Sequence, residues 1–406
     1  MRVSGIRVAE SGDACELRGW VESDANPDDT DWFAPFPLWW RFPTWCAPLL
    51  SERNGDPFLA ALLLPAMRVG ERLQVEASVS PRLLAAIPQI VTIYAAFDPR
   101  STRAPVEAAA RTASLPTDGS AARVGLFFSM GVDSSHSLLK NQRDHPDDQN
   151  TITHLISLHG IDVDHDGWDE AFPPLLLAGF ERVARETGKT LTPVVTNVRK
   201  VGARLAPWTM LHGGGLASVA LALGGGLRQV LIASSASYGA IYPWGTHPSL
   251  DPLWSTEGVT VVHDGCEADL ALKLAVVTKS PLVMETLRVC PGFGNGYNCG
   301  RCMKCMRTMV ALLHTGALER CRTLPHEIDA EALRVALRGP GGPVHRANFQ
   351  KRLDSLVASG MRPDLQAVIA EHLASLDEQT LLQQRREMRA PRQRRMWERV
   401  VGRLRA

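Results

Sequence analysis

Hydrophobic residues in the middle of the chain alternate between short apolar runs and longer amphipathic stretches. The short runs are typical of buried strands, and the amphipathic stretches that separate them are typical of helices. We expect strands at Val124–Phe128, Thr151–Leu158, Leu191–Thr196, Gln229–Ala233 and Val259–Val262, and helices from about Ser134, at Glu170–Gly188 and at Leu211–Leu223. This order predicts an α/β fold with a doubly wound parallel sheet.

Polar segments follow the predicted strands. In a doubly wound sheet the ligand binds beyond the carboxyl ends of the strands. We therefore expect four segments to converge there: Ser129–Ser135, His159–Asp164, Thr196–Asn197 and Ser234–Tyr238.

The flanking regions have different patterns. Residues 1–120 are predicted to form a separate mixed, mainly β domain, and residues 100–122 have the small, polar, Pro- and Gly-containing composition of a linker. Residues 121–313 would be the α/β domain, and residues 314–406 a helical C-terminal region with a basic tail. In the first domain we expect strands at Gly5–Val8, Cys15–Val21, Pro37–Phe42, Leu59–Leu64 and Arg72–Ala77, and a helix at Ser80–Ile93.

Composition narrows the functional classes. The 406 residues are 45% hydrophobic and 21% charged with a net charge of +1, which is ordinary for a globular protein and favours neither nucleic acid nor membrane as a partner. We find no signal segment and no apolar run long enough to span a bilayer, so we expect a cytoplasmic protein without membrane contact. There, eight reduced cysteines indicate metal binding or catalysis rather than disulfides.

The segment Ser129–Ser135 combines the end of a strand, a turn of small residues and the start of a helix. Free backbone N–H groups and the positive helix end make this arrangement a cradle for phosphate. The alternative is an ordinary turn capped by Asp133 or Ser134. No Gly-Lys-Ser/Thr follows, so it is not a Walker loop. Met130 fits a cradle only if its side chain points away from the phosphates or its backbone avoids positive φ.

Four cysteines near residue 300 form the strongest single signal. Their spacing is Cys290-x8-Cys299-x2-Cys302-x2-Cys305, with glycines at 292, 294, 296 and 300 that let the loop fold back on itself. Four thiolates suit a structural Zn²⁺, and an iron–sulfur cluster is the alternative.

Together these motifs resemble a known superfamily. The pattern Ser129-x-Gly131-x-Asp133-Ser134 resembles the SGGxDS loop of the PP-loop ATP pyrophosphatases, and the loop plus the cysteine knuckle resembles the 7-cyano-7-deazaguanine synthase group. The resemblance covers Val124–Leu313, roughly half of the chain, and Met130 replaces the family's second glycine. It implies a HUP-like (adenine nucleotide alpha hydrolase-like) fold, with ATP and Mg²⁺ as cofactors. It also implies a ligase that cleaves ATP to AMP and pyrophosphate, adenylates a small-molecule carboxylate or amide, and transfers nitrogen to form an amide or nitrile.

The resemblance suggests roles for individual residues. Ser129, Gly131, Ser134 and Ser135 would donate hydrogen bonds to the leaving pyrophosphate, and Asp133 would help to hold Mg²⁺ or cap the helix. Lys273 and Arg307, with Lys279, are the candidate phosphate cations. The expected catalytic set is Asp133, Ser134, Lys273 and Arg307; the expected nucleotide contacts are Ser129, Met130, Gly131, Val132, Asp133, Ser134, Ser135, His159, Asp162, His212 and Gly213; and Ser234, Ser235 and Tyr238 could face the acceptor.

Two alternatives stay open. One is a sulfur-inserting or tRNA-modifying enzyme, for which Cys266 is the thiol to test and the tail Gln383–Ala406, with nine arginines against two glutamates, could bind RNA. RNA is the less favoured partner. The other is a nucleotide-binding protein without turnover, which Met130 favours. A homodimer is also compatible with the sequence.

Overall fold

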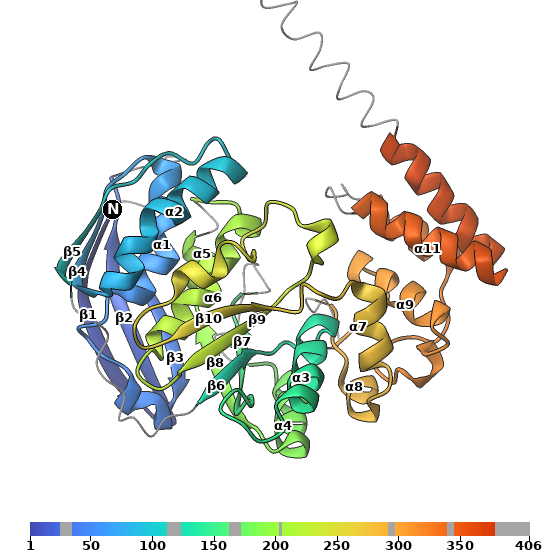
Figure 1. Cartoon of the computed structure of the whole chain (residues 1–406), viewed down its shortest axis with the longest axis horizontal. Helices are drawn as coiled ribbons and strands as arrows, with labels where there is room; N and C mark the ends of the chain where they lie inside the picture. Colours follow the sequence, from blue (N-terminus) through green and yellow to red (C-terminus); the bar gives the residue numbers. More distant parts are fainter. Residues whose placement is uncertain are drawn as a thin grey trace, which may run out of the picture. The chain divides into compact units, whose positions relative to one another are not determined.

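Ten strands form one sheet in the computed structural model of this chain (Figure 1). The structure describes residues 1–24, 35–111, 123–161, 172–202, 205–290, 297–338 and 345–377. Two compact units divide the chain, Met1–Asn298 and Cys299–Ala406, and each is described by itself.

The first unit contains all ten strands and eight helices of the described residues. The strands are β1 (Arg2–Ser11), β2 (Ala14–Glu22), β3 (Phe36–Pro43), β4 (Leu73–Val79), β5 (Val106–Arg111), β6 (Val124–Phe127), β7 (His154–His159), β8 (Thr190–Thr196), β9 (Gln229–Ala233) and β10 (Thr260–Asp264). The α-helices are α1 (Asp56–Val69), α2 (Pro81–Phe97), α3 (Val132–Asp144), α4 (Pro174–Thr187), α5 (Val198–Gly202), α6 (Trp208–Ala222), α7 (Leu270–Val277) and α8 (Pro281–Thr286).

The strand order is β10-β9-β6-β7-β8-β3-β2-β1-β4-β5. Strands β6 to β10 are parallel to one another, whereas β3 runs antiparallel to both β8 and β2. From β6 the chain first moves outward through β7 to β8 and then returns to place β9 on the other side of β6. The connections therefore change direction between β6 and β9, the place where such sheets bind ligands.

Both faces of the parallel strands are buried. Side chains alternate between the two faces of a strand, and here they alternate between two hydrophobic clusters. Phe127, Ile156 and Val230 join the cluster that contains α1 and α6. Their neighbours Leu126, Leu155 and Leu231 join the cluster that contains α3 and α4, which lie beside one another in Figure 1. The predicted α/β class, with helices on both faces of a mostly parallel sheet, is therefore confirmed.

One predicted strand is wrong. Leu59–Leu64 lies inside α1, which begins with Asp56 and Pro57 and ends at Gly70 with φ 72°. Pro at the first helical turn and a left-handed Gly at the end are ordinary helix boundaries. The helix is buried on every side except near its end, so its sequence lacks the helical period that would have distinguished it from a strand.

The predicted linker at residues 100–122 also contains structure. Val106–Arg111 forms β5, which pairs in parallel with β4 at the edge of the sheet. Residues 112–122 lie outside the described part of the chain.

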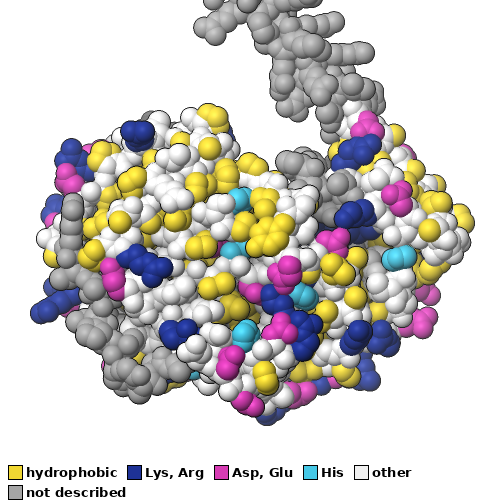
Figure 2. Space-filling model, in the orientation of Figure 1, with side chains coloured by type: hydrophobic (Ala, Val, Ile, Leu, Met, Phe, Trp, Pro, Cys, Tyr) yellow, Lys and Arg dark blue, Asp and Glu magenta, His cyan; other side chains and the backbone are white. Residues whose placement is uncertain are grey.

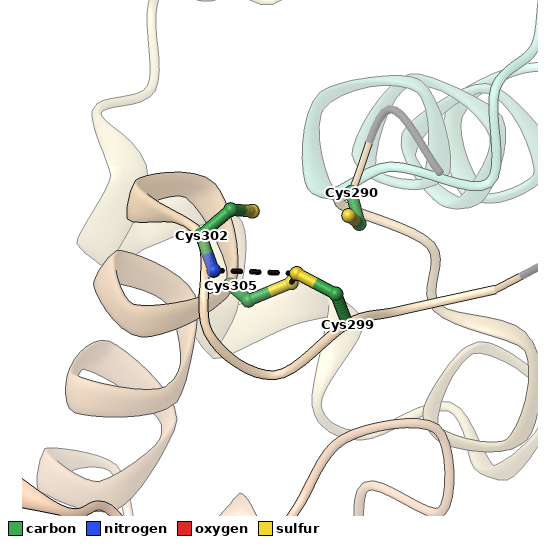
Figure 3. A group of neighbouring side chains, drawn as sticks. All are labelled: Cys290, Cys299, Cys302 and Cys305. Atoms are coloured by element: carbon green, nitrogen blue, oxygen red, sulfur yellow. Dashed lines mark hydrogen bonds between the residues drawn. The ribbon is translucent and has the colours of Figure 1, made fainter. Parts of the chain in front are cut away.

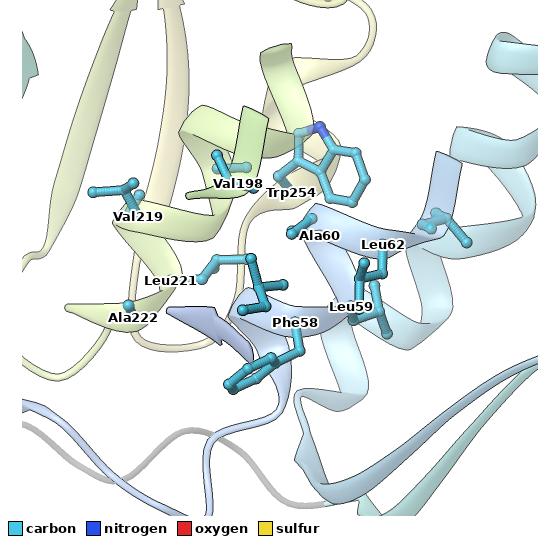
Figure 4. Packing of buried hydrophobic residues seen from close by; sticks show 14 of the residues in the cluster. Phe58, Leu59, Ala60, Leu62, Val198, Val219, Leu221, Ala222 and Trp254 are labelled. Atoms are coloured by element: carbon cyan, nitrogen blue, oxygen red, sulfur yellow. The ribbon is translucent and has the colours of Figure 1, made fainter. Parts of the chain in front are cut away.

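The two halves of the sheet, β1–β5 and β6–β10, share one hydrophobic cluster. Trp40 on β3 pairs with Thr196 on β8, and its indole N–H donates to Ser218 Oγ on α6 at 3.1 Å. Phe58, Leu59 and Leu62 of α1 pack near Leu221 and Ala222 of α6 (Figure 4). Residues on either side of position 120 therefore bury their apolar surface together, and the domain boundaries drawn from the sequence at 120 and 313 stay predictions.

The second unit contains the helices α9 (Met303–His314), α10 (Ala330–Ala336) and α11 (His345–Ser359). Within this unit α9 contacts both α10 and α11.

Lys and Arg side chains are interspersed with Asp and Glu on the face that Figure 2 displays. Among the described helices, none has the length and apolarity needed to cross a bilayer.

Candidate functional site

The loop after β6 forms a turn held by its own hydroxyl groups. The N–H of Ser129 donates to Ser134 Oγ at 3.2 Å, and the N–H of Gly131 donates to Ser129 Oγ at 3.3 Å. Gly131 is the N-cap residue of α3, and within the described residues no side chain caps this helix. The first-turn N–H groups of α3 therefore lack a capping acceptor, which is the condition for anion binding. The helix begins two residues before the predicted Ser134.

Met130 adopts the left-handed conformation, with φ 58°. Its side chain is 1% exposed and packs in the cluster of α3 and α4, where its sulfur lies 3.5 Å from Tyr297 Oη. The N–H of Arg288 donates to the Met130 carbonyl at 2.9 Å. The side chain thus points into the core and leaves the surface of the loop to backbone atoms. A left-handed backbone is unfavourable for any residue other than glycine. Burial of the thioether and this hydrogen bond stabilise Met130 in that conformation.

Lys273 brings a cation to the start of α3. Its side chain is 2% exposed, and Nζ lies 2.8 Å from Asp133 Oδ1. Nζ also donates to the backbone carbonyl of Ser234, just after β9. Lys273 comes from α7, which packs against α3. Two of the four predicted catalytic residues, Asp133 and Lys273, are therefore in direct contact although 140 positions separate them.

A second group of polar side chains lies further along α3. Ser137 Oγ donates to Asp264 Oδ2 at 2.5 Å, and Lys140 Nζ donates to Asp264 Oδ1 at 2.6 Å. His136 is 5% exposed, and its Nδ1 has no partner among the described residues. Burial lowers the pKa of His136, and the positive charges of Lys273 and Lys140 lower it further. This histidine is therefore neutral near pH 7.

Sequence reasoning missed His136, Ser137, Lys140 and Asp264. The signal was present, because Asp264 ends β10 and His136, Ser137 and Lys140 occupy positions i, i+1 and i+4 of one helix. That spacing becomes meaningful only in the folded chain, where Ser137 and Lys140 of α3 both bond Asp264 at the end of β10.

The residues at the ends of β7 and β8 contact other parts of the protein. His159 ends β7 and its ring packs against Phe172 at 5.3 Å between centroids. Asp162 and Asp164 lie outside the described residues. Thr196 and Asn197, expected at the ligand, instead bind the neighbouring strand: Thr196 Oγ1 donates to the Trp39 carbonyl at 2.7 Å, and Asn197 Oδ1 accepts from the Trp39 N–H at 2.9 Å.

His212 and Gly213 have packing partners. His212 Nε2 lies 3.3 Å from Thr246 Oγ1, and its ring packs against Trp244. A Cβ at Gly213 would lie 1.8 Å from the Gly245 carbonyl oxygen. The glycine is therefore required for close backbone packing, and a role of either residue in nucleotide binding stays a prediction.

Of the remaining cations, Lys279 is exposed just after α7, six positions beyond the buried Lys273. Arg307 lies on α9 in the second unit and is half-buried. Ser234 is buried, whereas Ser235 and Tyr238 are exposed.

The four cysteines gather into one group (Figure 3). The sulfur atoms of Cys290, Cys299, Cys302 and Cys305 all lie within 4.8 Å of one another. Tetrahedral zinc with Zn–S bonds of about 2.3 Å requires sulfur separations of about 3.8 Å, and Cys299 Sγ lies 3.9 Å from Cys305 Sγ. The donor set and its size therefore fit a zinc ion.

Backbone geometry supports this arrangement. The N–H of Cys302 donates to Cys299 Sγ at 3.2 Å, which stabilises a thiolate there. Cys302 is also the N-cap residue of α9, so the positive helix end faces the cysteines. Gly300 has φ 68°, and a Cβ there would lie 2.6 Å from Pro325 Cγ. Asn298 Oδ1 accepts from the N–H groups of Val289 and Cys290 and so holds the segment that carries the first cysteine.

No protein-family model, curated protein or solved structure matches this chain. Its function is therefore inferred from the residues themselves.

Proposed function

We propose that this chain is an ATP-dependent, AMP-forming enzyme of the PP-loop class with a HUP-like nucleotide-binding sheet. It adenylates a carboxylate or amide of a small molecule and transfers nitrogen to the activated carbon, as a C–N ligase related to the 7-cyano-7-deazaguanine synthases. One observation carries the proposal: buried Lys273 meets partly exposed Asp133 at the uncapped start of α3, beside the point where the strand connections change direction.

The chemistry follows from the charges at this point. Cleavage between the α- and β-phosphates develops negative charge on the leaving pyrophosphate. The protein stabilises this charge with hydrogen-bond donors and positive charges held in fixed positions. The first-turn N–H groups of α3, the hydroxyls of Ser129 and Ser134, and Lys273 are such donors. Because Lys273 is buried, its charge is weakly screened by water and acts more strongly on a nearby phosphate.

Asp133 has two roles in this proposal. Its side chain is 37% exposed, so one side faces solvent while Oδ1 holds Lys273. The carboxylate would supply an oxygen ligand to the Mg²⁺ that accompanies ATP. It also compensates the lysine when no nucleotide is bound, since an unpaired buried ammonium is costly.

The direct test is pyrophosphate release. The purified chain is incubated with Mg-ATP, ammonium chloride and a panel of small carboxylic acids, and pyrophosphate and AMP are measured. Lys273→Met should lower the rate by about 10²-fold or more, the usual effect of removing one preorganised donor. Lys279→Met is the matched control, because this exposed lysine lies on the same segment. ATP binding without pyrophosphate release for any acid would favour the alternative of a binder without turnover.

We also assign a structural Zn²⁺ to the cysteine group. All four positions are filled by protein thiols, which is typical of a structural rather than a catalytic zinc site. Cys302→Ser should lower the zinc content measured by mass spectrometry and lower the melting temperature. Cys46→Ser, a buried cysteine outside the group, is the control and should leave zinc content unchanged. Iron and sulfide in stoichiometric amounts would assign an iron–sulfur cluster instead.

A second candidate function has one observation in its favour. Cys266 Sγ lies 3.2 Å from Ser234 Oγ, and the carbonyl of Ser234 accepts from Lys273. A thiol so close to the proposed phosphate site would suit sulfur transfer. Cys266→Ser should abolish a sulfur-inserting reaction and should leave ammonium-dependent pyrophosphate release intact.

A further inference from the structure

A buried carboxylate and an imidazole form a pair next to the proposed site. Asp251, at the start of the 3₁₀ helix η3 (Asp251–Trp254), is fully buried, and its Oδ2 lies 2.6 Å from His263 Nδ1 on β10. Its other oxygen, Oδ1, accepts from the backbone N–H of His247 at 3.1 Å. Both carboxylate oxygens are thus hydrogen-bonded, Oδ1 to the backbone and Oδ2 to the imidazole.

The other ring nitrogen of His263 has no hydrogen-bond partner in the described part of the chain. The side chain is 4% exposed, and Nε2 is buried without a hydrogen bond to any described residue. His263 lines a cavity of about 10 Å³, together with Ser234, Ser235, Tyr242, Trp244 and His247. A cavity of this size has room for about one water-sized molecule. Because Nδ1 faces Asp251, Nε2 is the ring nitrogen left without a hydrogen bond among the described residues.

This cavity adjoins the proposed phosphate site through Ser234. The residue lines the cavity, and its carbonyl accepts the hydrogen bond from Lys273. Ser234 directly follows β9, and His263 lies on β10, which pairs with β9 in parallel. The pair therefore lies at the same edge of the sheet as the loop after β6.

We propose that Asp251 and His263 form the proton-accepting pair of this enzyme, in which His263 Nε2 removes a proton from a water-sized nucleophile, ammonia or water, bound in the cavity. This assignment rests on the proposed adenylating activity. His263 would be a catalytic residue, because it touches the nucleophile, and Asp251 a positioning residue, because it acts through His263.

The step balances as follows. The nucleophile's lone pair forms a bond to the carbon of the acyl adenylate, the bond from that carbon to the AMP oxygen breaks, and AMP leaves with the electron pair. The proton lost from nitrogen or oxygen passes to His263 Nε2. Asp251 holds the Nδ1–H tautomer, which leaves the lone pair on Nε2, and stabilises the imidazolium that forms.

The surrounding charges support this division of roles. His247, on the loop before η3, and Tyr94, on α2, are titratable groups that interact with this pair. Burial raises the pKa of Asp251, and the hydrogen bond from His263 opposes that rise. Burial and the nearby His263 lower the pKa of His247, so His247 is neutral near pH 7 and adds no competing charge.

The test separates adenylation from transfer in the full chain. With an acid that supports turnover, ATP–pyrophosphate exchange reports adenylation, and amide or AMP formation reports transfer. His263→Gln and Asp251→Asn should retain exchange and lower transfer by about 10²–10⁴-fold, the usual contribution of a general base. His145→Gln is the matched control, because His145 forms an exposed pair with Asp148 at 2.8 Å. Unchanged transfer in His263→Gln would overturn the proposal.

Two arms identify the nucleophile. If His263→Gln lowers transfer only when ammonium chloride is present, the nucleophile is ammonia. If His263→Gln lowers AMP formation in the absence of ammonium, the nucleophile is water. NMR of ¹⁵N-histidine-labelled protein tests the pair without any substrate: His263 should be protonated on Nδ1, and Asp251→Asn should change that tautomer. Protonation of His263 on Nε2 in the wild type would overturn the proposal, whereas absence of exchange with every acid would count against the proposed function alone.

Discussion

The two halves of the ten-stranded sheet differ in what they bury. Around β1–β5, the buried polar residues among the described part of residues 1–111 are Asp56, Ser80 and Ser101. Around β6–β10, the buried set includes a lysine, two histidines and an aspartate: Lys273, His136, His154 and Asp251. The same sheet thus has one half built almost entirely from apolar packing and one half that contains buried ionisable groups.

This difference follows from the cost of burying charge. An ionisable group is transferred from water to the protein interior at a cost that partners only partly recover. In the first half, the buried carboxylate of Asp56 accepts from the N–H of Ser80 and so stabilises the backbone where α2 begins. In the second half, Lys273 and Asp251 also bond backbone groups, but each is in addition paired with an ionisable side chain, Asp133 for Lys273 and His263 for Asp251. Buried ionisable groups that are paired with a second ionisable side chain are the better indicators of chemistry.

The largest effect is expected in the apolar half. Phe58 is fully buried and packs edge-on against Trp40 at 5.0 Å between centroids. Phe58→Ala should lower the free energy of unfolding by about 3–5 kcal/mol, measured by urea denaturation, without changing the rate of pyrophosphate release at low temperature. Trp20→Ala, at an exposed position, is the control. A rate change in folded Phe58→Ala would show that the two halves are not functionally separate.

His154 tests whether every buried ionisable group of the second half is functional. It begins β7, at the opposite end from the proposed site. Burial and Arg123 lower its pKa to about 4, compared with 6.5 for a free histidine. Only the unfolded chain takes up this proton between pH 6.5 and 4, so stability is lost as the pH falls through that range, by about 3 kcal/mol. His154→Phe should remove this part of the pH dependence and leave activity unchanged. If the stability of the wild type and that of His154→Phe depended equally on pH, the lowered pKa of His154 would be contradicted.

Met130 tests the cost of the loop conformation. Met130→Gly relieves the strain of a non-glycine residue at positive φ, which should raise the free energy of unfolding by about 1 kcal/mol. It also deletes a buried thioether, which should lower the free energy of unfolding by roughly 2–5 kcal/mol. We expect a net loss of about 2 kcal/mol in thermal or urea unfolding. Pyrophosphate release should persist, because glycine adopts the same φ. Loss of that release with the fold retained would show that the side chain itself acts at the site.

The smallest effect is expected for a surface ion pair in the first half. The side chains of Arg72, just before β4, and Glu107, on β5, lie 2.6 Å apart, and both are about half exposed. Arg72→Ala should change the free energy of unfolding by less than about 0.5 kcal/mol. A larger loss in urea denaturation would indicate that the first half also depends on charge.

Local pattern alone predicted most of the parallel half. The strands at Val124, Leu191, Gln229 and Val259 and the helices between them appear in the structure close to their expected positions, because short buried strands and amphipathic helices leave distinct periods. The cysteine spacing likewise located the metal group, since ligands on one short loop meet whatever the rest of the chain does.

Two features needed the tertiary structure. Leu59–Leu64 is helical because α6 and the sheet bury it on nearly all sides, and a run that is apolar all round carries no period to read. Lys273 meets Asp133, and Asp251 meets His263, only after α7 and η3 pack against the sheet. Sequence determined the strands and helices of the parallel half and where the thiols gather. Tertiary packing decided which charges are buried together, because the pairing of distant side chains depends on how whole elements pack rather than on any local pattern.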